Sequence, residues 1–262
     1  MSVNQPPLFV KRQERRPDAF LGDKLSILQP ESGFKAGLDS VLLGASVPEG
    51  TKDLLDLGAG AGVAALCALA HDSCRHATLV ENNAQMLVLA ARNIETNGFA
   101  ARANLIDLSA AASGTERKAR GLATDRFDTV IANPPFFASG TRAPDAARAA
   151  ARHAEGDIGT WVRTAVSSAH AKGTVIFVHL AEALPQLLDT FGARMGAITV
   201  LPIVPRPGRP ASRVLVRGTK GSKAPMRLLS PMVLHEETGN GFTPLVQSIL
   251  RGDSRLDWHN RA

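Results

Sequence analysis

The chain has 262 residues, of which 44% are hydrophobic and 21% charged, and it carries a formal net charge of +6. This length allows one large α/β domain, and the composition is that of an ordinary globular protein. No apolar run approaches the roughly 18 residues of a membrane-spanning helix, and the N-terminus lacks a signal-peptide core, so we expect a cytoplasmic protein with no membrane partner.

The predicted elements begin after a polar, basic lead. We expect residues 1–20 to be flexible and residues 21–262 to form a single domain. The stretch DKLSILQPESGF (23–34) is typical of a hairpin, and the next segment predicts a helix that Asp39 caps and that ends near residue 47.

Strands and helices then alternate along the chain. Apolar runs predict strands at 53–57, 77–81, 103–108, 127–134 and 173–179, and the segments between them predict helices at 62–70, 83–96, 157–171 and 181–191. Two consecutive strands, AITVLPIVP and SRVLVRG, are expected to pair antiparallel, and one more strand and a closing helix should follow. This alternation predicts a mainly parallel sheet with helices on both faces, and ligands at the carboxyl ends of its strands.

A glycine loop follows the first strand of this series. It reads Asp56-Leu57-Gly58-Ala59-Gly60-Ala61-Gly62. Glycines allow a tight turn and close approach of a ligand, and the following helix points its positive end at that ligand. A dinucleotide-binding fold uses a similar turn, but Asp56 would repel a pyrophosphate and would suit the ammonium of an amino-acid ligand.

Two further acids end the next two strands. Glu81 can accept both hydroxyls of a ribose, and Asp107 can accept a hydrogen bond from an adenine amino group. Together with the glycine loop these acids predict a pocket for S-adenosylmethionine, with S-adenosylhomocysteine as the product. The two cysteines, Cys67 and Cys74, have no companion ligands at suitable spacing, so no metal is expected.

The fourth strand of the series ends in the motif Asn133-Pro134-Pro135-Phe136. The Asn133 side-chain oxygen and the Pro134 carbonyl could hold the two hydrogens of an exocyclic amine, while Pro135 stiffens the turn. Phe136 offers a flat face on which a base can stack. This arrangement predicts methylation of an amine on a conjugated base, with positioning as the main source of acceleration.

With this motif the chain resembles the class I methyltransferases that carry an N-P-P-[FY] sequence. It is most similar to the bacterial tRNA adenine-N6 methyltransferases, which modify the adenosine next to the anticodon of valine tRNA. FKAGLDSVLLGASV (34–47), AEGDIGTWV (154–162), PASRVLVRG (210–218) and VLHEETG (233–239) carry the rest of the resemblance. It implies a Rossmann-like fold with a seven-stranded sheet whose last strand is antiparallel.

The resemblance also implies cofactor roles for residues outside the glycine loop. Residues 21–50 would cover the cofactor, with Lys35, Gly37 and Asp39 taking part, and Asn82 would join Glu81. The chain departs from the family pattern at Leu38, where Thr is expected, and at Asn82-Asn83, where an acid and a proline are commoner.

Basic residues cluster in three stretches and favour a polyanionic partner, here RNA. Two of the clusters lie in residues 11–16 and 142–153. We predict phosphate binding for the third, represented by Arg206, Arg209, Arg213 and Arg217. A basic but merely solvated surface is the alternative.

Other functions remain compatible with these patterns. The Asn-Pro-Pro motif also serves enzymes that methylate a guanine amine in ribosomal RNA or a glutamine amide in protein. A small-molecule O-methyltransferase, an RNA-binding module without turnover and an NAD-dependent oxidoreductase are the remaining alternatives. The sequence leaves the oligomeric state, the RNA and the nucleotide open.

Overall fold

The computed structural model describes residues 17–135 and 157–258. It begins with a two-stranded antiparallel hairpin of β1 (Asp18–Phe20) and β2 (Leu25–Ile27). The hairpin expected near the start of the domain is therefore present, but it starts earlier than expected. Its first strand uses residues that we had assigned to the flexible lead.

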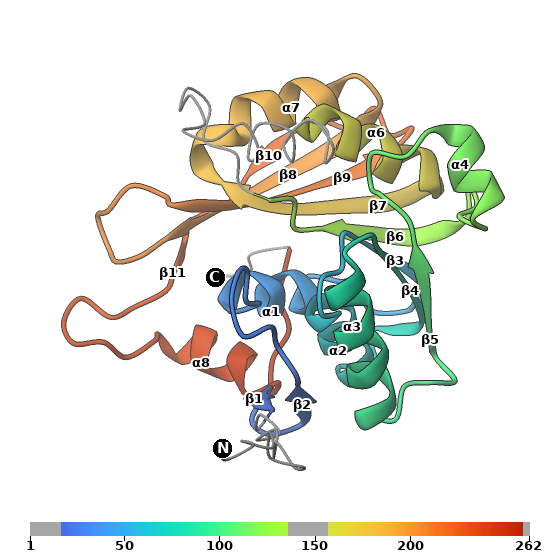
Figure 1. Cartoon of the computed structure of the whole chain (residues 1–262). Helices are drawn as coiled ribbons and strands as arrows, with labels where there is room; N and C mark the ends of the chain where they lie inside the picture. Colours follow the sequence, from blue (N-terminus) through green and yellow to red (C-terminus); the bar gives the residue numbers. More distant parts are fainter. Residues whose placement is uncertain (1–16, 136–156, 259–262) are drawn as a thin grey trace, which may run out of the picture.

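The centre of the molecule is a sheet with helices on both faces (Figure 1). Within the described ranges it has nine strands, in the order β10-β8-β9-β7-β6-β3-β4-β5, with β11 also beside β8. The strands are β3 (Thr51–Leu57), β4 (Cys74–Glu81), β5 (Ala103–Asp107), β6 (Phe127–Ala132), β7 (Ala169–Leu180), β8 (Met195–Val204), β9 (Arg213–Lys220), β10 (Arg227–Leu228) and β11 (Met232–Val233).

The sheet is parallel except where β9 lies between β7 and β8 and pairs antiparallel with both. The expected Rossmann-like sheet with an antiparallel last strand is thus confirmed. The strands β10 and β11 extend it at the β8 edge. Strand order reverses between β3 and β6, which lie side by side, so their carboxyl ends form the point where ligands of such sheets bind.

The helices follow the predicted alternation, except that α4 lies between β5 and β6, where no helix was expected. They are α1 (Leu38–Ala45), α2 (Val63–Ala70), α3 (Ala84–Thr96), α4 (Gly114–Ala119), α6 (Ile158–Ser168), α7 (Leu184–Gly192), preceded by a 3-10 turn η1 (Ala181–Ala183), and α8 (Pro244–Leu250). In Figure 1, α1, α2 and α3 lie on one side of the sheet, and α6 and α7 on the other. None of the helices in the described ranges is long and apolar enough to cross a membrane.

Helix α3 begins and ends as the sequence predicts. The Asn83 side chain accepts hydrogen bonds from the backbone N–H groups of Gln85 (3.0 Å) and Met86 (3.1 Å), which caps the helix. At the other end Gly98 takes a φ of 73°, which is the left-handed conformation that stops a helix.

Helix α1 begins differently from the prediction. Its N-cap is Gly37, with no side-chain cap, and Asp39 lies in the first turn. The Asp39 carboxylate instead accepts a hydrogen bond from Nε of Arg213 on β9 (3.1 Å). Asp39 was therefore wrongly assigned as the cap, because a partner distant in sequence competes for its side chain.

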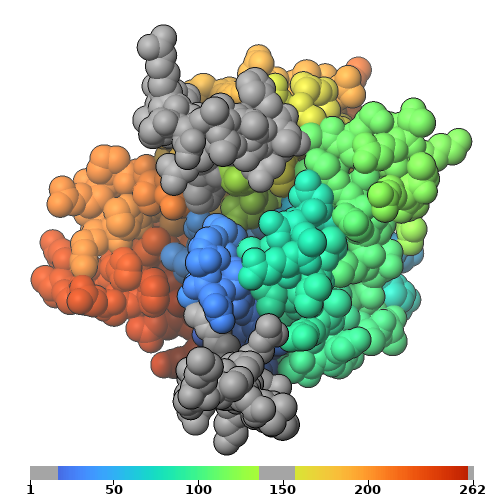
Figure 2. Space-filling model, in the orientation of Figure 1, coloured from blue at the N-terminus to red at the C-terminus, as the bar shows by residue number. Residues whose placement is uncertain are grey.

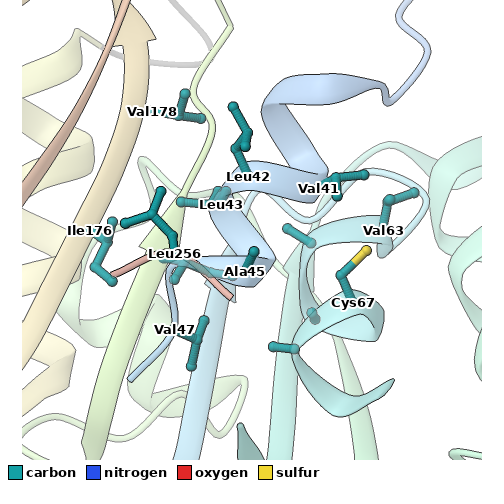
Figure 3. Packing of buried hydrophobic residues seen from close by; sticks show 14 of the residues in the cluster. Val41, Leu42, Leu43, Ala45, Val47, Val63, Cys67, Ile176, Val178 and Leu256 are labelled. Carbon is teal, nitrogen blue, oxygen red and sulfur yellow. The ribbon is translucent and has the colours of Figure 1, made fainter. Parts of the chain in front are cut away.

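Helix α1 is firmly packed between the sheet and α2. Figure 3 shows Leu42 of α1 beside Val178 of β7, and Val41 facing Val63 and Cys67 of α2. These side chains are all buried. The segment that enters α1, residues 28–37, is consequently held at its C-terminal end by a rigid part of the core.

Candidate active site

A cavity of about 570 Å³ lies at the point where strand order reverses. One wall is the glycine loop and a second is the end of β4. Asn133, Pro134 and Pro135 form a third wall, and residues from 29–36 of the N-terminal segment form a fourth. The cavity therefore gathers residues that are far apart in sequence, from Gln29 to Trp161, at the carboxyl ends of the parallel strands.

The glycine loop needs its glycines for two different reasons. Gly58 has a φ of 72°, and a Cβ at this position would overlap the indole ring of Trp161 on α6. Gly60 has a φ of 56°, and nothing lies within 4 Å of where its Cβ would be. Gly58 thus permits close packing below the loop, whereas Gly60 leaves space on the ligand side.

Glu81 fastens the glycine loop to the end of β4. Its Oε2 accepts a hydrogen bond from the Gly60 N–H (2.8 Å), and its Oε1 accepts from the N–H groups of Asn82 and Asn83 (2.8 Å each). A carboxylate offers about four lone-pair sites, so three donors leave room for a further one. Both Glu81 and Asn82 line the cavity, where Glu81 can still accept a ligand hydroxyl.

Asp56 is a buried acid at the cavity wall. Only 2% of its surface is exposed, and its carboxylate accepts a hydrogen bond from the Ala65 N–H in α2 (3.1 Å). Burial raises the pKa of Asp56 to about 7, the Ala65 hydrogen bond lowers it in part, and the charge of Glu81 raises it further. A cationic ligand group in the cavity would relieve this cost by stabilising the ionised carboxylate.

Asn133 follows β6 and brings an amide into the same cavity. Its Oδ1 is buried, and among the described residues it has no hydrogen-bond partner. A buried acceptor without a donor costs about 1–3 kcal/mol. Such an atom in a native structure calls for a ligand donor or another functional explanation.

The structure therefore brings together most of the predicted site. Asp56, Gly58, Gly60, Glu81, Asn82, Asn133, Pro134 and Pro135 all line the cavity. Gly62 does not line it but serves as the N-cap of α2, with a φ of 87°. Phe136 lies outside the described residues.

Besides Gly62, four further predicted cofactor residues do not line the cavity. Asp107 is exposed at the end of β5, and Leu108, Ser109 and Ala110 line the cavity after it. Lys35, Gly37 and Asp39 are also absent from its walls, although Phe34, Ala36 and Ser40 around them are present. The segment is thus placed as the resemblance implies, but different residues of it face the cavity.

Trp161 was not singled out by the sequence, although it lines the cavity and is buried. It lies in the AEGDIGTWV stretch, which carried part of the resemblance but gave no sign of a role for the ring. The Trp161 ring lies where a Cβ on Gly58 would be, and this contact depends on the packing of α6 against the glycine loop, which the sequence does not reveal.

The predicted phosphate-binding arginines mostly have partners within the protein. Arg206 donates to the backbone oxygens of Glu236 and Gly239 (2.6 Å each). The Arg217 guanidinium lies 5.5 Å from the centre of the Trp258 ring, and burial lowers its pKa. Since Arg213 binds Asp39 as described above, these three side chains stabilise the fold, and only Arg209 keeps the expected open position at the exposed β8–β9 turn.

Comparison with known proteins agrees with this fold. Residues 36–159 match the family model of the methyltransferase small domain. A tRNA1(Val) (adenine(37)-N6)-methyltransferase from Tolumonas auensis is 31% identical over 170 residues, which cover 64% of this chain and 66% of that protein. The chain thus spans just under two thirds of that relative's own length.

Two further proteins are similar over a larger part of the chain. A protein of the same name from Shewanella baltica is 27% identical over 236 residues, which cover 88% of this chain and 97% of that one. The solved structure of a predicted O-methyltransferase from Agrobacterium tumefaciens has a TM-score of 0.71 and 27% identity, and the match covers 83% of this chain and 98% of that one.

The chain thus has the Rossmann-like fold of the class I methyltransferases, with a cavity beside its glycine loop. Its residues 36–159 match the methyltransferase small domain, and the chain is similar to two bacterial proteins named tRNA1(Val) (adenine(37)-N6)-methyltransferase.

Proposed function

We propose that this protein is an S-adenosylmethionine-dependent methyltransferase that acts on the exocyclic amino group of adenine in tRNA, at the adenosine next to the anticodon. The observation that carries the proposal is Asn133, which lines the cavity and whose buried Oδ1 has no donor among the described residues. It is an acceptor placed where an amine N–H can reach it.

The residues around the cavity fit the proposed cofactor. Glu81 has acceptor capacity left for one ribose hydroxyl, and Gly60 leaves space beside it. Burial raises the pKa of the Asp56 carboxyl at the cavity wall, and the ammonium of the cofactor would stabilise its ionised form. When bound, S-adenosylmethionine supplies an electrophilic methyl group, and the chain's own residues need only hold the acceptor in line with it.

The cavity wall formed by Asn133, Pro134 and Pro135 would bind the acceptor amine through the two hydrogens on its nitrogen. In this proposal the Asn133 Oδ1 accepts one N–H and the Pro134 carbonyl accepts the other, which raises the electron density on nitrogen. Pro135 fixes the backbone so that the Pro134 carbonyl keeps its direction. The amine proton is lost to solvent after transfer, so no strong base is required at the wall.

A nucleic-acid acceptor is supported by two independent features. Two of the similar proteins reported above, those from Tolumonas auensis and Shewanella baltica, are named tRNA adenine methyltransferases, and the whole chain carries a net charge of +6. An anticodon-loop base is already unpaired, so placing it in the cavity costs less than extracting a base from a duplex.

The proposal is tested by methyl transfer from tritiated S-adenosylmethionine to separate fractions of tRNA, ribosomal RNA and protein. We expect label in the tRNA fraction, because the proposed acceptor is an adenine that is already unpaired in the anticodon loop. Label confined to ribosomal RNA or to protein would establish a guanine or glutamine acceptor in place of adenine. A protein that binds S-adenosylmethionine but labels none of the fractions would contradict the proposed activity.

A further inference from the structure

Two asparagines of α3 hold the N-terminal segment by its backbone. Asn97 Oδ1 accepts from the Ser26 N–H (2.9 Å), and Asn97 Nδ2 donates to the Ser26 carbonyl (2.9 Å). One turn earlier, Asn93 Oδ1 accepts from the Leu28 N–H (2.8 Å), and Asn93 Nδ2 donates to the Leu28 carbonyl (3.0 Å). We call these four hydrogen bonds the amide ladder.

Through the amide ladder, side chains of α3 bond the backbone N–H and C=O groups of the N-terminal segment as the backbone of a neighbouring strand would. Residues four apart lie on the same face of a helix, and alternate residues of an extended segment point their backbone groups to the same side. Each amide offers one acceptor and one donor, which match the N–H and C=O of a single backbone residue. Figure 2 shows the result, with the N-terminal segment (blue) directly beside α3 (teal).

Asn93 also reaches the glycine loop. Its Nδ2 donates a second hydrogen bond to the Ala61 carbonyl (2.9 Å), and the residue is completely buried. Asn97, which is half-buried, makes no such contact and instead donates to the Asn93 carbonyl (2.7 Å). The Asn93 side chain therefore joins the glycine loop, which forms one wall of the cavity, to the segment whose continuation, residues 29–36, forms another wall.

The segment beyond the ladder is the one that lines the cavity. Gln29, Pro30, Ser32, Gly33 and Phe34 follow Leu28 directly and face the cavity, before the chain enters α1. These residues lie in neither a helix nor a strand. Their position thus depends on the ladder at one end and on the packed α1 at the other (Figure 3).

We propose that Asn93 is a positioning residue for cofactor binding, which sets the spacing between the glycine loop and the wall formed by residues 29–36. This inference rests on the proposed cofactor, S-adenosylmethionine. Without Asn93 the wall loses its link to the loop, and part of the binding free energy goes into ordering it again. Asn97 holds the same segment but not the loop, so it contributes less to this spacing.

The test compares Asn93→Leu with Asn97→Leu, the same change at two positions of one helix. A third variant, Leu187→Ala on α7, reduces stability by removing a fully buried side chain away from the cavity. Calorimetry with S-adenosylhomocysteine gives the Kd of each protein. We expect Asn93→Leu to raise Kd about tenfold or more, Asn97→Leu to raise it less, and Leu187→Ala to leave it unchanged.

Kinetics provide a second measure that general destabilisation would not move. In Asn93→Leu the KM for S-adenosylmethionine should rise, while kcat at saturating cofactor and the KM for tRNA stay within about twofold of the wild type. Equal effects of Asn93→Leu and Leu187→Ala on Kd would overturn the inference, as would a Kd unchanged in Asn93→Leu.

Hydrogen exchange on the unaltered protein covers the case in which Asn93→Leu does not fold. S-adenosylhomocysteine should slow exchange of the Leu28 amide together with the amides of residues 31–36, because the ladder and the wall are ordered as one unit. Binding that leaves Leu28 exchange unchanged would refute the role of the ladder. A wild-type protein that does not bind the ligand at all would instead refute the proposed function itself.

Discussion

Asn133 is the residue on which the proposed chemistry depends. Its amide oxygen is buried in the cavity wall without a donor in the described ranges, although proteins rarely leave such an atom unpaired. Its neighbour Pro134 is buried too, and both follow directly on the end of β6. An acceptor held this rigidly is suited to orienting an amine that has little nucleophilicity of its own.

Replacing Asn133 should separate binding from catalysis. Asn133→Ala removes the acceptor but leaves Glu81, Asp56 and the glycine loop in place, so the affinity for S-adenosylmethionine should stay near that of the wild type. Methyl transfer should fall by about 100-fold or more, as when one preorganised polar group is removed from other active sites. Calorimetry and single-turnover transfer measure the two effects, and equal turnover in both proteins would rule out the role of the amide.

At the level of elements, the contact between β3 and α2 holds the buried Asp56 carboxylate at the wall of the cavity. Asp56 ends its strand inside the core and accepts a hydrogen bond from the start of α2, and burial raises the pKa of its carboxyl to about 7. A group with a raised pKa stabilises the folded state at low pH. That contribution is lost as the pH rises from near 4 to above 7.

Asp56→Asn should therefore remove a pH-dependent part of the stability. Asparagine can still accept from Ala65 but carries no charge, so we expect the variant to be more stable than the wild type at pH 8 by about 1–3 kcal/mol. The difference should be small only at about pH 3, where the carboxyl of Asp56 is protonated in the unfolded chain as well as in the folded protein, and it should grow steadily as the pH rises toward 7. Urea unfolding across this range measures it, and parallel pH profiles for the two proteins would contradict the explanation.

The same substitution should weaken binding of the cofactor. The ammonium of S-adenosylmethionine loses a buried counter-charge in Asp56→Asn, so its Kd should rise while the free protein becomes more stable. Calorimetry on the same samples gives this second value. A gain in stability without any loss in affinity would show that Asp56 does not face the ammonium.

At the level of elements the sequence predicts most of the fold correctly. Strands read as short apolar runs and helices as the segments between them, and local signals such as Asn83 and Asn97-Gly98 mark the limits of α3. The two-residue strands β10 and β11 were predicted as one strand because such short pairs leave no periodic pattern. The start of α1 was misplaced because the partner of Asp39 is 174 residues away.

For the site, the sequence predicts where residues lie but not the direction in which their side chains point. Acids at strand ends were expected to face one cavity, which Asp56 and Glu81 do, whereas Asp107 is exposed. A strand end fixes the position of a residue but not the side to which the following turn directs it. Trp161 and the amide ladder depend on contacts between elements that are far apart in sequence, so no local pattern could have predicted them.

At the level of the whole molecule, the basic residues divide into structural and exposed ones. Arg206 joins the β8–β9 turn to the loop before α8, while Arg209 lies in the same turn with its side chain exposed. Charge alone does not separate these roles, because both residues belong to one basic run. Phosphate binding by the run is therefore expected of Arg209 and not of Arg206.

This division gives a matched pair of variants. Arg209→Ala should raise the KM for tRNA and reduce its salt dependence by about one phosphate contact, with an unchanged melting temperature. Arg206→Ala should lower the melting temperature because it removes hydrogen bonds to two backbone carbonyls. Titrations at several salt concentrations and thermal unfolding measure these effects, and identical salt slopes for Arg209→Ala and wild type would exclude a phosphate contact.

The central claim is that Asn133 and Pro134 hold an adenine amine of tRNA inside the cavity, and mass spectrometry of tRNA nucleosides tests it most directly. The tRNA comes from a strain lacking this protein, complemented with wild type or with Asn133→Ala. We predict that N6-methyladenosine in the valine tRNA is absent from the deletion strain, restored by the wild type and not restored by the variant. Full restoration by Asn133→Ala, or an unchanged level of N6-methyladenosine in the deletion strain, would contradict the claim.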